Sequence, residues 1–376
     1  MYNQFQNPVF FIDELQYRFA VGLMDKNSIT FSDYITGFDK DKTSKLFTLD
    51  PSLKHSMKFG SFNFPDHTHT PEMFLSAELG ITDLEELKTL DQISLFVLGH
   101  NFKSTGIYKT TLSLPLENFS IINYETNAFS CIDGYTIMSR YNNSTLSETN
   151  NLNDTFLEFS IIGAESYAYE ENSEIEIGCI SFCVPYAFPH SPNMEITTSY
   201  DFGLKTQNTI GGERLDTYNW QKPQKWGDLP CWELHNPSVP FHSVEYNGEI
   251  IYSTNKETYF KHSKLGRRSW EMSFTMLGDE KLFGTSYSLD TDYYNSDFEN
   301  INTGWSKENS FYYNVLHKTL GGKLPFIFHP NADQLSLASE DILSEFAICK
   351  LDMNNISFTQ IANGVYDVNL RIVECW

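Results

Sequence analysis

Two histidine-containing segments are the strongest candidates for chemistry in this sequence. The first holds His67 and His69, with Asp66 before them and Glu72 after them. Residues two apart on an extended segment project to one side, so both imidazoles and a carboxylate could bind one transition metal. Plain loops contain such pairs too, and no third histidine follows at a telling spacing. We therefore expect no metal or other cofactor and keep His67 and His69 as weak metal candidates.

His100 and Asn101 form the second candidate, because they directly follow an apolar run at residues 95–98. Loops at the ends of strands are common places for ligands, and a sugar is the ligand considered at this one. A tight turn uses the same residues, since Asn tolerates left-handed backbone and its side chain bonds nearby backbone groups. The turn interpretation is favoured, and ligand binding by His100 and Asn101 is the alternative.

A hydrolytic enzyme would need a nucleophile with a partnered base, or two carboxylates at a suitable separation. The sequence contains no Gly-x-Ser-x-Gly elbow and no glycine-rich phosphate loop. A carboxylate pair leaves no sequence pattern, so a polysaccharide-degrading enzyme stays as an alternative. We predict a protein that is not an enzyme.

The chain of 376 residues carries a formal net charge of −23. Nucleic-acid binding relies on clustered Lys and Arg, so nucleic acid is not an expected partner. The longest apolar runs, such as residues 93–98, fall far short of the roughly 20 residues that span a bilayer, so no membrane insertion is expected. The N-terminal residues lack the pattern of a secretory signal, and we expect synthesis in a cytoplasm.

Aromatic residues make up 15% of the sequence, which favours strands and large contact surfaces over helices. Short apolar or alternating runs separated by polar turns predict a mainly β fold. The predicted strands are residues 9–12, 17–23, 93–98, 155–162, 270–277 and 324–328, with two or three more in 346–376.

Two helices are predicted within this β-rich pattern. A capping box precedes residues 83–90, where leucines recur at helical spacing. In 307–320, apolar residues from Phe311 to Leu320 fall near one face, and two glycines follow.

The length suits two domains, and a shift to Gly, Trp and Pro near residue 195 separates 1–195 from 196–376. Cys179 and Cys183 lie four residues apart on one predicted strand, which is too far for a disulfide. We expect them to be small buried fillers.

Several short motifs, in this order, resemble those of tailed-bacteriophage tail structural proteins of the distal-tail or baseplate type. The first-half motifs are Gly99-His100-Asn101, Ile177-Gly178, the prolines Pro185, Pro189 and Pro192, and Gly211-Gly212-Glu213-Arg214. The second-half motifs are the segment from Arg268 to Phe274, the segment from Gly322 to Phe326, and Glu374-Cys375-Trp376.

This resemblance implies a discoidin-like β-sandwich, or jelly roll, in 1–195 and a β-rich, belt-like oligomerisation domain in 196–376. It implies a non-enzymatic virion protein, assembled in the host cytoplasm, that forms a ring-like homo-oligomer such as a hexamer. Other tail proteins and a host surface glycan are the further expected partners. The alternatives are a glycan- or receptor-binding tail protein, which a trimer would indicate, and a polysaccharide-degrading enzyme.

A subunit interface is predicted in the second half. Tryptophans in Gly- and Pro-rich sequence are typical anchors between subunits. The paired arginines that follow Gly266 could bind a neighbour's carboxylates through bidentate contacts, or form an exposed hairpin tip. The predicted interface residues are Arg214, Trp220, Trp226, Arg267, Arg268 and Trp270.

Overall fold

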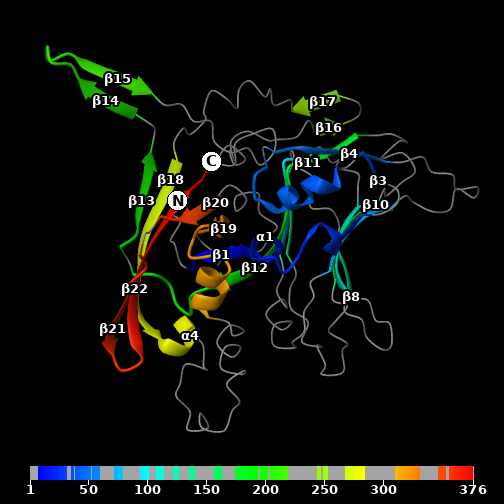
Figure 1. Ribbon diagram of the computed structural model, residues 1–376. Coiled ribbons are helices and arrows are strands. Elements are labelled where there is room, and N and C mark those ends of the chain that lie inside the picture. The colour runs from blue at the N-terminus through cyan, green and yellow to red at the C-terminus, as the bar shows by residue number, and fades with distance from the viewer. Residues whose placement is uncertain are drawn as a thin grey trace, which may run out of the picture.

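The structure is a computed structural model, drawn as a ribbon in Figure 1. It describes residues 7–31, 35–37, 39–51, 53–59, 72–78, 94–100, 107–113, 122–126, 135–139, 156–162, 174–193, 195–201, 204–218, 244–246, 249–252, 267–283, 310–330, 346–352 and 355–375.

Strands dominate these residues, and the predicted mainly β fold class is confirmed. The strands before residue 195 are β1 (Val9–Asp13), β2 (Ile29–Phe31), β3 (Ile35–Thr36), β4 (His55–Phe59), β5 (Glu72–Glu78), β6 (Ser94–Leu98), β7 (Ile107–Ser113), β8 (Ile122–Thr126), β9 (Tyr135–Ser139), β10 (Phe156–Ile162), β11 (Glu174–Ile177) and β12 (Cys179–Ala187). The later strands are β13 (Thr197–Asp201), β14 (Leu204–Asn208), β15 (Arg214–Tyr218), β16 (Val244–Tyr246), β17 (Glu249–Tyr252), β18 (Arg267–Gly278), β19 (Phe326–His329), β20 (Ala347–Leu351), β21 (Phe358–Ala362) and β22 (Val365–Glu374).

The helical segments are short and lie beside this β framework. They are α1 (Glu14–Val21), η1 (Lys26–Ser28), η2 (Lys40–Phe47), α4 (Asp279–Phe283) and η8 (Tyr312–His317).

The largest sheet has ten strands in the order β13-β18-β22-β20-β19-β1-β12-β6-β9, with β21 paired to β22. Strand β1 lies inside this sheet, antiparallel to β12 on one side and to β19 on the other. The first described strand therefore joins strands from before and after residue 195. The domain boundary at that residue stays a prediction.

Smaller sheets accompany the large one. A five-stranded sheet has the order β2-β5-β10-β7-β8, and a three-stranded sheet has the order β11-β4-β3. Two hairpins, β14-β15 and β16-β17, complete the pairings. In Figure 1 the β14-β15 hairpin projects away from the large sheet at the end of β13.

The core of the large sheet is rich in aromatic side chains. Phe10 of β1 is fully buried, and its ring centroid lies 5.6 Å from that of Phe326 and 5.4 Å from that of Phe328. Phe188 and Phe311 also contact it edge-on, at 6.1 and 6.3 Å. One side chain of β1 thus joins β19, the end of β12 and η8 into a single hydrophobic cluster.

The prediction of a strand at residues 17–23 is wrong, because this segment mostly belongs to α1. Asp13 caps the helix by accepting hydrogen bonds from the backbone N–H groups of Leu15 and Gln16. Gly22 ends the helix in the left-handed conformation, with φ of 79°. Both signals are in the sequence, but the apolar run obscures them.

The predicted helix at 307–320 is confirmed in position, although η8 is shorter and wider than an α-helix. Its backbone hydrogen bonds include Lys318 N–H to Tyr313 O and Gly321 N–H to Leu316 O, each spanning five residues as in a π-helix. Phe311 and Val315 are fully buried, as the apolar spacing predicts.

Several other predicted elements are confirmed. Strands β6, β10, β18 and β19 fall within or beside the predicted ranges, and β20 to β22 account for the end of the chain. Cys179 and Cys183 are free and fully buried, as expected. The predicted helix at 83–90 lies outside the described residues.

Candidate functional site

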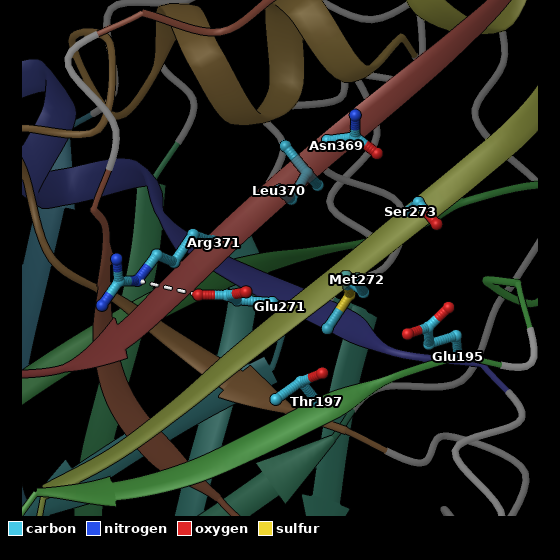
Figure 2. A pocket seen from close by; sticks show the side chains of 8 residues that line it. All are labelled: Glu195, Thr197, Glu271, Met272, Ser273, Asn369, Leu370 and Arg371. Carbon is cyan, nitrogen blue, oxygen red and sulfur yellow. Dashed lines mark ion pairs between the residues drawn. The ribbon is translucent and has the colours of Figure 1, made fainter.

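A groove on the outer face of β13, β18 and β22 is the first candidate site, and Figure 2 shows the side chains that line it. Its volume is about 310 Å³. The lining residues are Glu195, Thr197, Glu271, Met272, Ser273, Asn369, Leu370 and Arg371.

Strand register explains why these residues meet. Thr197 pairs with Glu271 and Glu271 pairs with Arg371, so the three side chains form one row across the sheet. Ser273 and Asn369 form the next row. The residues between these rows face the hydrophobic core instead, because side chains alternate along a strand.

Charge in the groove is only partly compensated. Arg371 Nε lies 3.4 Å from Glu271 Oε1 and 3.4 Å from Asp352 Oδ2. All three side chains are more than half exposed, so these pairs contribute little to stability. Glu195 is exposed beside them and adds a further negative charge.

Asn193 fixes the segment that presents Glu195. Its side-chain amide donates to Ser273 Oγ at 3.1 Å, and its carbonyl oxygen accepts from Thr275 Oγ1 at 2.9 Å. Its backbone N–H donates to Ser273 O at 2.8 Å. The proline-rich corner before β13 is therefore held against β18.

The chemistry of the groove is hydrogen bonding by hydroxyl, amide, carboxylate and guanidinium groups. None of its eight lining residues is a histidine or cysteine, and its two carboxylates are Glu195 and Glu271. None is aromatic, so these residues provide no ring on which a sugar could stack.

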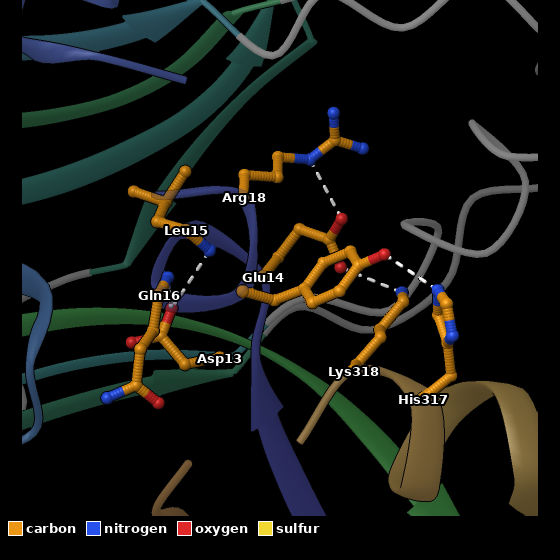
Figure 3. Close-up of polar contacts among 8 residues, drawn as sticks. Asp13, Glu14, Leu15, Gln16, Arg18, His317 and Lys318 are labelled. Carbon is orange, nitrogen blue, oxygen red and sulfur yellow. Dashed lines mark hydrogen bonds and ion pairs between the residues drawn. The ribbon is translucent and has the colours of Figure 1, made fainter. Parts of the chain in front are cut away.

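A second candidate is the buried charge cluster between α1 and η8, shown in Figure 3. Glu14 Oε1 lies 2.8 Å from Arg18 Nε, and Glu14 Oε2 lies 2.7 Å from Lys318 Nζ. The three side chains are 1 to 3% exposed. Although burial alone would raise it, the charges of Lys318 and Arg18 lower the pKa of the Glu14 carboxyl below its usual value.

Asp13, the neighbour of Glu14, has the opposite environment. No cation is among the groups that shift its pKa, and burial raises that pKa from 3.8 to about 7. Hydrogen bonds from Ser181 and from the backbone of α1 oppose this rise. Asp13 and Glu14 are each 2% exposed, so a substrate in solution cannot reach their carboxyl groups.

The outer side of the cluster is aromatic. Tyr17 Oη and His317 Nε2 share a hydrogen bond of 2.8 Å, and the His317 ring stacks on Tyr313. Lys318 Nζ lies 5.0 Å from the centre of the Tyr313 ring. Burial and the charge of Lys318 lower the pKa of His317, so its imidazole is neutral at pH 7. The cluster is a packing contact between α1 and η8.

The predicted ligand residue His100 lies directly after β6 and is 4% exposed. Gly99, before it, has φ of 69°, and a Cβ there would lie 2.3 Å from Pro51 O. A Cβ on Gly178 would meet the same oxygen at 2.3 Å. The structure thus brings the two glycine motifs together against Pro51, and this explains both glycines. Ligand binding by His100 stays a prediction.

The predicted interface residues Arg268 and Trp270 make contacts within the chain. Arg268 donates from Nε and from a terminal nitrogen to the two carboxylate oxygens of Glu374, at 3.0 and 2.8 Å. Trp270 is 2% exposed and packs on Phe328 at 5.2 Å. The bidentate contact expected with a neighbour therefore forms inside this chain. Their place at a subunit interface stays a prediction.

Arg214 lies on the β14-β15 hairpin, where it contacts Asp216. Arg267 is the first residue of β18, and its side chain is half-buried. The remaining predicted residues lie outside the described part of the chain: His67, His69, Asn101, Trp220 and Trp226.

Within the described ranges, no three His, Cys, Asp or Glu side chains gather where they could hold a metal ion. None of the helices in this part of the chain is long and apolar enough to span a membrane.

No family model matches the sequence, and no curated protein matches it. Among the solved structures that match, two carbohydrate-binding modules are similar at low scores. CBM32-3 from a family 31 glycoside hydrolase of Clostridium perfringens has a TM-score of 0.22 and 15% identity, over 43% of this chain and 94% of that chain. A pectin-binding carbohydrate-binding module has a TM-score of 0.19 and 9% identity, over 41% of this chain and 88% of that chain. Similarity at this level supports no statement about function, and the resemblance to tail proteins stays a prediction.

Proposed function

We propose that this chain is a structural protein of a tailed-bacteriophage tail, which assembles with copies of itself into a ring and docks other tail proteins. The order of its sequence motifs suggested this function. The observation that carries it is exposed apolar surface at both ends of the β13-β18-β22 part of the sheet.

At one end of the sheet, Ile210 and Leu215 stand exposed on the β14-β15 hairpin. At the other end, Met276 on the bulge of β18 is 76% exposed, and Ile361 of β21 is 48% exposed. Figure 1 places β15 and β21 at opposite ends of this sheet. Different surfaces at two ends allow head-to-tail contacts, which close into rings when the rotation permits.

The buried charge cluster supports assembly over turnover. Its carboxylate, Glu14, is paired with Arg18 and Lys318 of the same chain and is out of reach of a substrate. The groove has two carboxylates, Glu195 and Glu271, so a polysaccharide-degrading enzyme is the alternative that it favours. A protein whose polar clusters hold its elements together suits a mechanical role.

Native mass measurement of the purified protein tests the proposal, with electron microscopy of the same sample. We expect a single species of several copies and ring-shaped particles. A monomer at micromolar concentration would overturn the proposal. A trimer without rings would favour the receptor-binding alternative, and release of products from host polysaccharide would favour an enzyme.

A further inference from the structure

The β14-β15 hairpin is surrounded by solvent on both faces. From Lys205 to Asp216, every residue is exposed except Thr209, which is half-buried in the turn. Isolated two-stranded hairpins are marginally stable in water, because neither face is buried. A hairpin that projects away from the large sheet in this way is suited to pack against another surface.

One face of the hairpin is occupied by its own hydrogen bonds. Asp216 Oδ1 accepts from Thr206 Oγ1 at 2.7 Å and from Arg214 Nε at 2.8 Å. Thr206 pairs with Asp216 and Asn208 pairs with Arg214, so these four side chains share that face. The ladder fixes the register of the two strands and satisfies the charged groups locally.

The opposite face carries the apolar surface. Gln207 pairs with Leu215, so both project to the side away from the ladder. Leu215 is 54% exposed, and Ile210 at the turn is exposed as fully as in an extended chain. Leu215 and Ile210 are therefore the surface that gains most from being covered.

Charge indicates which partner fits. The described hairpin has two basic residues, Lys205 and Arg214, and two acidic residues, Glu213 and Asp216, so its net charge is zero. The whole chain carries a formal net charge of −23, so two copies repel one another overall. Because the hairpin has no net charge, it can approach another copy with less electrostatic repulsion than a surface that shares the chain's negative charge.

We propose that the face of the β14-β15 hairpin that bears Leu215, together with Ile210 at its turn, docks on a second copy of this chain. This inference rests on the proposed function and names the segment through which copies associate.

The test compares the self-association of the full-length wild type and four variants by sedimentation at a series of concentrations. Leu215→Asp places a charge in the contact and should raise the dissociation constant by about a hundredfold, whereas Leu215→Ala should raise it by about tenfold. Asn208→Asp adds the same charge to the opposite face and should change it less than threefold. Leu23→Asp replaces a leucine that is 61% exposed on the main body and serves as the matched control.

The outcomes separate the two proposals. If the wild type associates and Leu215→Asp does not, while both controls do, the hairpin contact is supported. Unchanged association of Leu215→Asp with an oligomeric wild type overturns the hairpin contact and leaves ring assembly standing. Equal loss in Asn208→Asp or Leu23→Asp also overturns it, because the effect would not belong to this face. A monomeric wild type overturns the proposed function itself.

Discussion

At the scale of single residues, neighbours in sequence can have opposite electrostatic environments. Asp13 and Glu14 are equally buried, but the cations Arg18 and Lys318 contact only Glu14. Burial therefore raises the pKa of Asp13 to about 7, whereas the two cations lower that of Glu14. At pH values below about 7 the folded protein therefore favours a protonated Asp13, whereas Glu14 is ionised at neutral pH.

The raised pKa of Asp13 predicts a pH-dependent cost to stability. Between pH 3.8 and about 7 the folded state holds a proton that the unfolded state has lost, so the contribution of Asp13 to stability falls as pH rises. Asp13→Asn removes this effect and keeps a good helix cap. The variant should gain up to about 4 kcal/mol on the wild type between pH 4 and 7, measured by urea unfolding.

Asp25 provides the control for this measurement, since it caps η1 but is exposed. Hydrogen bonds from Asn27 and Ser28 lower its pKa, so its ionised form stabilises the fold above the unfolded pKa and that contribution disappears as pH falls. Asp25→Asn should therefore be less stable than the wild type at neutral pH. A difference for Asp13→Asn that is constant from pH 4 to 7 would contradict the assignment.

The sequence alone could not distinguish these two carboxylates. Asp13 as a helix cap is recognisable from Glu14 after it and Gly22 at the helix end. The lysine that pairs with Glu14 lies in the other half of the chain, and local patterns carry no information about such a contact.

At the scale of elements, η8, from the second half of the chain, packs against α1, from the first half. Backbone hydrogen bonds in this segment span five residues. The same segment contains Lys318, which pairs with Glu14, and His317, which shares a hydrogen bond with Tyr17. Apolar spacing predicted a helix here correctly. It could not predict the wider turn, because the buried residues recur at nearly the same positions in both forms.

Removal of the charge from Lys318 tests this connection. Lys318→Met keeps most of the buried aliphatic chain but leaves Glu14 with one cation, and removing one partner of a buried pair typically costs about 3 kcal/mol or more. We expect that loss in the free energy of unfolding. Lys323→Met, an exposed position in the same segment, should change little. Similar stabilities for the two variants would show that the pair contributes no net stability.

At the scale of the whole molecule, β1 unites the large sheet. It pairs with β12 and β19, and Phe10 packs against aromatic residues from both sides of residue 195. The sequence predicted most strands of the sheet. It did not predict their order, since pairing of β1 with β19 depends on contacts between distant parts of the chain.

The central position of β1 predicts how fragments behave. Residues 196–376 alone would expose the edge of β19 and the ring surfaces that cover Phe10, so we expect this fragment to aggregate. The same fragment with residues 7–22 fused to it should be more soluble and give a cooperative thermal transition, followed by circular dichroism. Cooperative unfolding of the unfused fragment would contradict this role of β1.

The position of β1 also has a consequence for biosynthesis. A ribosome makes Phe10 and Phe11 well before it completes β12, and it completes β19 later still, so the two rings lack native strand partners while the intervening segments are made. Pairings between such distant segments form slowly. Until they form, an unpaired apolar strand can associate with other chains and aggregate. Folding of the nascent chain therefore depends on the slow pairing of β1 with strands made later, and chaperones that shield β1 should raise the yield of folded protein.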